Sequence, residues 1–203
     1  MRLYIIRHGE TEWNKVKRLQ GQTDIPLAEE GIRLARLTGE GMRDFPIDFV
    51  ISSPLERAVQ TARLLTEGRD IPILTDMRII EISFGEWEGE CIFDSEVLPK
   101  EFRRLFYEDP MHCICPPGGE TFADVCRRTG NFYQSLLSNP DYADKNILIS
   151  THGAAGRCLL SQFYEDKNDI WRGGVPKNCA VTTVEVIGNE SCVVEKDRIF
   201  YEN

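Results

Sequence analysis

The sequence predicts an α/β fold in which a mostly parallel central sheet lies between two layers of helices. Short apolar runs typical of buried strands recur along the chain, and segments with helical spacing of apolar residues separate most of them. A chain of 203 residues, 41% of them hydrophobic, can bury one sizeable core. We therefore expect a three-layer α/β/α sandwich and a single domain over residues 1–203.

Six apolar, partly β-branched runs have the length of buried strands. They cover residues 3–6, 48–52, 71–74, 146–150, 180–187 and 191–197. The last two follow each other closely, so we expect them to pair antiparallel at an edge of the sheet.

Helical segments fill most of the intervals, at residues 28–43, 122–137 and 153–164 and within "SSPLERAVQTARLL". In that last stretch we expect Ser53 to cap the helix, Pro54 to take the first helical position and Glu56 to complete a capping box. Residues 94–107 are compatible with either helix or loop, and "CICPPGGE" with a surface loop.

Charge and cysteine content exclude several classes of partner. The net charge is −9 and no block of lysine and arginine resembles a nucleic-acid-binding tail, so we expect no nucleic-acid or acidic-membrane partner. No stretch has the apolar length of a membrane-spanning helix, and Arg7 and His8 interrupt the first apolar run before it could be a signal segment. Seven scattered cysteines favour reduced thiols and a cytoplasmic protein, and a homodimer is compatible with this composition.

Cationic or protonatable side chains follow three of the predicted strands. Arg7 and His8 end the first, "SSP" after the second leads into Arg57, and His152 follows the fourth. In an open α/β sheet, ligands bind at the carboxyl ends of the strands. Each of these residues taken singly is more often a solvated arginine or a hydrogen-bonded core histidine, but together they favour a compact anion, and phosphate fits best.

A carboxylic acid for proton transfer is available in "RIIEISFGEWEGE". Glu81 lies among isoleucines and a phenylalanine, and apolar neighbours raise the pKa of a carboxyl group so that it can carry a proton at neutral pH. Glu86, Glu88 and Glu90 are expected to form a solvated acidic turn, and Trp87 to pack in the core.

A metal site finds weaker support. His112, Cys113 and Cys115 are soft ligands, but a structural zinc site normally needs four ligands, so we expect no metal there and interpret His112 as a loop residue. Two further alternatives stay open: a metallohydrolase using His8, His152 and a carboxylate, and a catalytically silent phosphate-binding module.

Five segments in order along the chain resemble the motifs of the histidine phosphatase superfamily, which includes the cofactor-dependent phosphoglycerate mutases. They are "RHGETEWN", "SSPLERAVQTA", "EISFGEWEG", "PPGGET" and "STHGAAGR", and "PKNCAVTTVEV" near the end is also similar. The resemblance implies a phosphoglycerate mutase-like version of the predicted sandwich.

The resemblance also implies roles. His8 would be the nucleophile that forms a phosphohistidine, with its other ring nitrogen donating a hydrogen bond that fixes the reactive tautomer. Arg7, Arg57 and His152 would bind the phosphoryl oxygens, and Glu81 would protonate the leaving oxygen and then assist water. This chemistry requires no metal and no cofactor.

Four further residues match positions that line the phosphate or substrate side of the site in this family: Asn14, Gln20, Gly21 and Gly153. Gln20 could equally be an exposed loop residue.

The motifs do not decide between hydrolysis and transfer back onto a sugar acid. Mutases of the family carry extra basic residues before the glycine-rich loop, whereas residues 91–117 here offer only Lys100, Arg103 and Arg104, at a spacing typical of a solvated helix face. We therefore expect a histidine acid phosphatase-type phosphomonoesterase acting on a small phosphorylated metabolite, such as a sugar phosphate or a nucleotide-derived phosphate. A cofactor-dependent phosphoglycerate mutase is the alternative.

Four aromatic residues of this region are open to two interpretations. They could form a partly apolar lid over the leaving group, or they could simply pack in the core. They are Phe84, Phe93, Phe102 and Phe106.

Overall fold

The computed structural model describes residues 1–188 and 190–202, which form a six-stranded sheet between two layers of helices. The strands are β1 (Arg2–Arg7), β2 (Phe49–Ser52), β3 (Ile73–Thr75), β4 (Asn146–Thr151), β5 (Val181–Ile187) and β6 (Glu190–Arg198). Their order in the sheet is β3-β2-β4-β1-β5-β6. The first four in this order run parallel, and β5 and β6 run antiparallel, which confirms the predicted mostly parallel sheet with an antiparallel edge.

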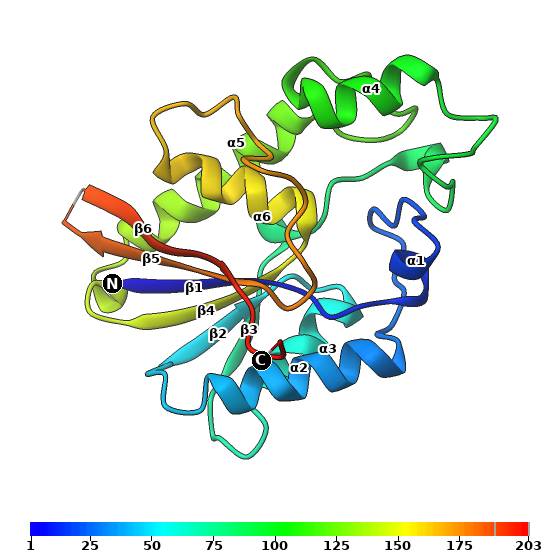
Figure 1. The fold of residues 1–203 in the computed structure, drawn as a ribbon. Helices are drawn as coiled ribbons and strands as arrows, with labels where there is room; N and C mark the ends of the chain where they lie inside the picture. Colours follow the sequence, from blue (N-terminus) through cyan, green and yellow to red (C-terminus); the bar gives the residue numbers. More distant parts are fainter. Residues whose placement is uncertain (189, 203) are drawn as a thin grey trace.

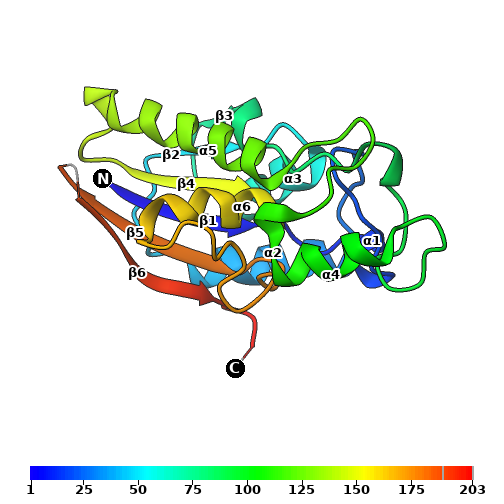
Figure 2. The same cartoon turned by 90° about the horizontal axis from the view of Figure 1, so that it is seen from above.

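Helices cover both faces of the sheet, as the alternation of elements predicts (Figure 1). One face carries α5 (Phe122–Leu137) and α6 (Gly153–Leu160), and the other carries α2 (Glu29–Gly41) and α3 (Glu56–Leu65). Two further helices, α1 (Glu12–Lys15) and α4 (Lys100–Glu108), lie beyond the carboxyl ends of the parallel strands (Figure 2).

Side-chain alternation along β1 explains the two layers. Leu3 and Ile5 pack in the cluster against α5 and α6, whereas Tyr4 and Ile6 pack in the cluster against α2 and α3. Successive residues of a strand point to opposite faces, and a strand buried on both faces is therefore apolar throughout. The burial of Leu3 through Ile6 thus follows directly from the unbroken apolar run at the start of the chain.

Two predicted helix boundaries are wrong, and the segment 94–107, which is compatible with helix or loop, is helical in part. The helix α3 begins at Glu56 with Leu55 as its N-cap and no side-chain cap, because the Ser53 hydroxyl lies against His152 instead. The helix α6 ends at Leu160 and continues only as a 3₁₀ turn, Ser161–Phe163. Of residues 94–107, the part from Lys100 onward is helical.

Candidate active site

The carboxyl ends of β1, β4 and β2, which are neighbours in the sheet, bring the predicted residues together. Arg7 is the last residue of β1, His152 is the N-cap of α6 directly after β4, and Arg57 is the second residue of α3 after β2. Arg57, His152 and His8 are buried, and Arg7 is half-buried. The strand order places these distant segments at one edge of the sheet.

The rings of His8 and His152 lie side by side, with 5.1 Å between their centroids and an angle of 61° between their planes. The Nδ1 atom of His8 donates a hydrogen bond to the Gly9 carbonyl at 2.7 Å, which leaves Nε2 as the ring nitrogen with a lone pair. The Nε2 atom of His152 lies 2.7 Å from Ser53 Oγ, and its buried Nδ1 has no partner among the described residues.

Both histidines are held in the neutral form. Burial lowers the pKa of His8 and of His152 well below 6.5, and the positive charge of Arg57 lowers both pKa values further. A neutral imidazole keeps its lone pair at and below neutral pH, so His8 has the protonation state of a nucleophile.

The two arginines are oriented by backbone carbonyls. Arg57 donates to the Gly21 carbonyl at 2.7 Å and to the Thr23 carbonyl at 2.9 Å, and Arg7 donates to the Pro176 carbonyl. Burial lowers the pKa of Arg57 to about 10 and also lowers that of Arg7. Both buried Nε atoms lack a partner among the described residues. Arg7, Arg57 and the neighbouring His8 form what we call the floor of the pocket. Buried donors are rarely left unpaired, so this floor is suited to an anion.

The carboxylate of Glu81 lies at the N-terminus of α6, in a more polar environment than its apolar sequence neighbours predict. It accepts from the backbone N–H groups of Ile82 and Ala155 at 2.9 Å and from Ala154 at 3.3 Å. These three backbone donors fix the orientation of the carboxyl group toward the pocket side of α6.

A pocket of about 610 Å³ opens above these residues. Arg7, His8, Arg57 and Glu81 line it, and so do the four predicted substrate-side residues Asn14, Gln20, Gly21 and Gly153. Gln20 is buried, which excludes its interpretation as an exposed loop residue. His152 does not line the pocket, although its ring lies next to that of His8.

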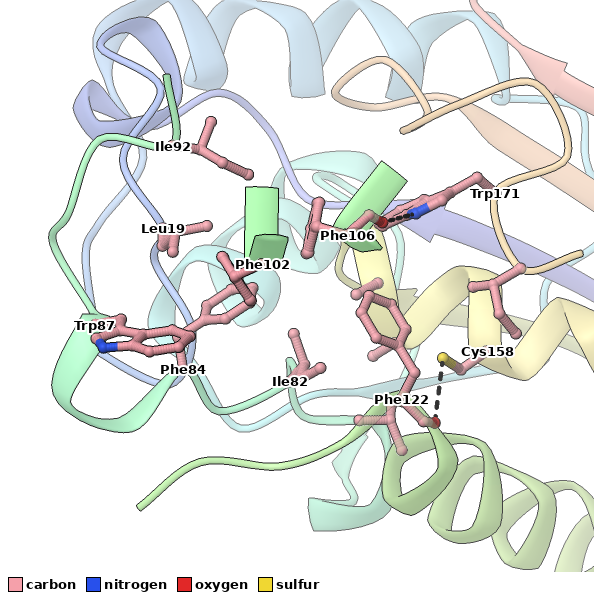
Figure 3. Packing of buried hydrophobic residues seen from close by; sticks show 14 of the residues in the cluster. Leu19, Ile82, Phe84, Trp87, Ile92, Phe102, Phe106, Phe122, Cys158 and Trp171 are labelled. Carbon is pink, nitrogen blue, oxygen red and sulfur yellow. Dashed lines mark hydrogen bonds between the residues drawn. The ribbon is translucent and has the colours of Figure 1, made fainter. Parts of the chain in front are cut away.

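The outer wall of the pocket is apolar and aromatic. Phe84, Phe93 and Phe106 line it. Phe102 packs in the core between Phe84 and Trp87 (Figure 3). Both interpretations of the four phenylalanines therefore hold in part. The buried Trp87 confirms the packing role predicted for it.

Several pocket residues were not predicted from the sequence. Trp171 also lines the apolar wall of the pocket, and its indole N–H donates to the Phe106 carbonyl (Figure 3). The other unpredicted residues include the cations Lys17, Arg18 and Lys177 and the amide Asn178. They lie in irregular segments with no periodicity, and the only available signal was the family-like "PKNCAVTTVEV" around Asn178.

The acidic turn is only partly solvated. Glu86 is exposed as expected, but the carboxylate of Glu88 accepts from the backbone N–H groups of Gln22, Thr23 and Phe84, and Glu90 accepts from a serine hydroxyl. Glu88 thus fixes the loop whose carbonyls orient Arg57.

The remaining predicted groups lie away from the pocket. His112 is exposed and pairs with Asp109 at 2.9 Å, and Arg104 pairs with acidic residues of its own helix. Neither Lys100 nor Arg103 lines the pocket. Over residues 1–188 and 190–202, no three His, Cys, Asp or Glu side chains are grouped to hold a metal ion, and no helix of this part of the chain is long and apolar enough to span a membrane.

Fold and site together define a class of α/β proteins in which two neutral histidines lie side by side and two arginines line an anion-binding pocket. The chain belongs to the histidine phosphatase superfamily (branch 1), whose family description matches residues 3–197.

Three similar proteins place the chain within this superfamily. It is 37% identical over 159 residues to the uncharacterized phosphatase PhoE of Bacillus subtilis (strain 168), covering 78% of this chain and 75% of PhoE. It is 34% identical over 185 residues to the "Probable phosphoglycerate mutase GpmB" of Yersinia pestis (strain Pestoides F), covering 91% of this chain and 85% of GpmB. The solved structure of YhfR of Bacillus stearothermophilus superposes with a TM-score of 0.90 at 31% identity and covers 98% of this chain and 97% of YhfR.

Proposed function

We propose that this protein is a phosphomonoesterase that hydrolyses a small phosphorylated metabolite through a phosphohistidine on His8, without a metal ion. The observation that carries the proposal is the floor of the pocket, where a neutral His8 lies beside two guanidinium groups whose buried Nε atoms have no partner among the described residues. Phosphoryl transfer depends mainly on positioning and on charge stabilisation, and this floor supplies both.

In the first step, Nε2 of His8 attacks phosphorus and the bond from phosphorus to the ester oxygen breaks. The hydrogen bond from Nδ1 to the Gly9 carbonyl stabilises the positive charge that develops on the ring. Arg7 and Arg57, which line the pocket, hold the phosphoryl oxygens, and His152 lies beside the ring of His8. Glu81 lines the same pocket, starts this step protonated and donates its proton to the leaving oxygen.

In the second step, water attacks the phosphohistidine, Glu81 accepts a proton from that water, and phosphate leaves while His8 regains its lone pair. Of the two carboxylate oxygens, Oε2 accepts only the longer bond from Ala154, at 3.3 Å, and is therefore the oxygen we assign to proton transfer.

The test is release of phosphate from an aryl phosphate in the presence of a chelator. We expect metal-independent turnover in the wild type, no turnover in His8→Ala, and turnover slowed on the order of a hundredfold or more in Glu81→Gln. Rapid quenching should trap a phosphoenzyme that is stable in alkali and labile in acid, as a phosphohistidine is. Unchanged turnover in His8→Ala would reject the nucleophile, and loss of activity in chelator would favour a metallohydrolase.

The similarity to GpmB, which is named as a probable mutase, keeps phosphoglycerate mutase as the second candidate. We favour the phosphatase, because Lys100, Arg103 and Arg104, the basic residues of the segment where mutases of the family carry theirs, do not line the pocket. The other cations of the lining, Lys17, Arg18 and Lys177, lie outside that segment. Incubation with 3-phosphoglycerate and its bisphosphate primer discriminates the two: formation of the 2-isomer indicates a mutase, and release of phosphate alone indicates a phosphatase.

A further inference from the structure

The segment 172–178, between α6 and β5, touches the residues at the end of β1. The Pro176 carbonyl accepts from the guanidinium of Arg7, and the Asn178 side chain donates to the His8 carbonyl at 2.9 Å. The position of this segment therefore sets the position of the Arg7 guanidinium.

The backbone of this segment combines a flexible glycine pair, Gly173 and Gly174, with two conformationally restricted residues, Val175 and Pro176. Gly173 and Gly174 have φ angles of +100° and +111°, a region of backbone conformation that residues other than glycine rarely adopt. The next two residues are stiff, because proline fixes its own φ and restricts the preceding residue, here the β-branched Val175, to extended conformations. A displacement of Gly174 is therefore transmitted to the Pro176 carbonyl.

Arg157 holds the glycine pair in place through the Gly174 carbonyl. Its side chain is 3% exposed, and its Nε and Nη2 atoms donate to the Gly174 carbonyl at 3.2 and 3.0 Å. Its Nη1 and Nη2 atoms also donate to the two carboxylate oxygens of Asp197 at 3.1 and 2.7 Å. Arg157 thus connects α6, the end of β6 and the glycine pair, and it does not line the pocket.

We propose that Arg157 and Asp197 are positioning residues for phosphate binding, an inference that rests on the proposed function. By fixing the Gly174 carbonyl they keep the Pro176 carbonyl against Arg7, and so keep the Arg7 guanidinium aimed at the phosphate. The guanidinium makes four hydrogen bonds from three nitrogens in a fixed plane, to the Gly174 carbonyl and to both carboxylate oxygens. The single nitrogen of a lysine ammonium has three donors and cannot reproduce this arrangement.

The first variant is Arg157→Lys, which keeps the charge and loses the planar guanidinium. Two measurements follow its effect: the dissociation constant for inorganic phosphate, and the rate of tryptic cleavage after Lys167, Arg172 and Lys177, which lie in or next to the segment. We expect phosphate affinity to fall on the order of tenfold, because a misaligned charged group loses much of its binding strength. Cleavage should become several-fold faster.

Two further variants keep the result interpretable. Asp197→Asn removes the charge from a side chain that is 28% exposed and should reproduce both changes even if Arg157→Lys folds poorly. Arg78→Lys is the matched control, because Arg78 pairs with Asp76 outside the lining of the pocket and should leave phosphate affinity and cleavage unchanged.

The outcomes separate this inference from the proposed function. If the wild type binds phosphate and both variants bind it equally well, or if both are cleaved at the wild-type rate, the positioning role is overturned. If the wild type itself does not bind phosphate, the proposed function fails, and faster cleavage of the variants would then show only that the pair holds the segment.

Discussion

Glu88→Gln should destabilise the protein strongly although its neighbour Glu86 is exposed. The Glu88 carboxylate accepts four hydrogen bonds, from the N–H groups of Gln22, Thr23 and Phe84 and from the Thr23 hydroxyl. Glutamine keeps one acceptor oxygen and turns an NH₂ group toward the other two donors, so two of the four bonds are lost.

The magnitude follows from these contacts. Hydrogen bonds to charged groups contribute about 1.5–3 kcal/mol each, and the half-buried position lets water replace part of the loss, so the lower end applies, about 3 kcal/mol for two bonds. In a chain of 203 residues, each kcal/mol shifts Tm by about 2–4 °C, which gives a Tm lower by about 6–12 °C. Because Arg57 is oriented by carbonyls of the loop that Glu88 holds, KM for an aryl phosphate should also rise, on the order of tenfold.

Thermal unfolding followed by circular dichroism, with steady-state kinetics on the same samples, measures both effects. The matched control is Glu86→Gln, which removes the same charge from an exposed side chain and should shift Tm by no more than about 1–2 °C. If the two variants melt together, the bonds to Glu88 do not hold the loop and the reasoning is refuted.

Three further predictions concern the site. The pKa values of His8 and His152 are lowered on folding, so below about pH 6.5 the unfolded chain binds more protons than the folded one. The free energy of unfolding should therefore be constant above that pH and fall below it. The slope should reach up to about 1.4 kcal/mol per pH unit for each histidine. Denaturant titrations at pH 7, 6 and 5 measure this slope, which should be roughly halved in His152→Gln, and an unchanged slope in that variant would contradict it. Ser53→Ala leaves Nε2 of His152 buried without its partner and should cost about 1–3 kcal/mol in stability, measured by urea unfolding; a loss below 0.5 kcal/mol would show that the bond contributes little. Trp171→Phe removes the donor to the Phe106 carbonyl and should cost about 1 kcal/mol and raise KM for aryl phosphates more than kcat falls; equal effects on the two constants would argue against a wall that contacts the leaving group.

The sequence was sufficient where local pattern decides the structure. Apolar runs specify strands, and a polar residue directly after such a run marks the end of the strand, so Arg7, His8 and His152 could be placed at one edge of the sheet without coordinates. Arg57 followed from the same logic at the start of a helix.

Where long-range contacts decide the environment of a side chain, the sequence misled. Glu81 has apolar neighbours along the chain, but its carboxylate lies against the N-terminus of α6, which is more than seventy residues away. Ser53 has the sequence context of a helix cap, but its hydroxyl serves His152 from the adjacent strand end. The wall around Trp171 lies in irregular backbone, where no periodicity indicates which residues face the ligand.

The partners of the two arginines explain how a chain of net charge −9 can keep a positive pocket floor. Arg57 and Arg7 donate to backbone carbonyls, which fix the direction of each guanidinium without cancelling its charge, as a carboxylate would. Burial makes that uncompensated charge costly, which is why the pKa of Arg57 falls to about 10. A bound phosphate dianion supplies the missing negative charge. The desolvation cost of the two uncompensated guanidinium groups is then offset by binding, and the pocket therefore favours an anionic ligand over a neutral one of the same shape.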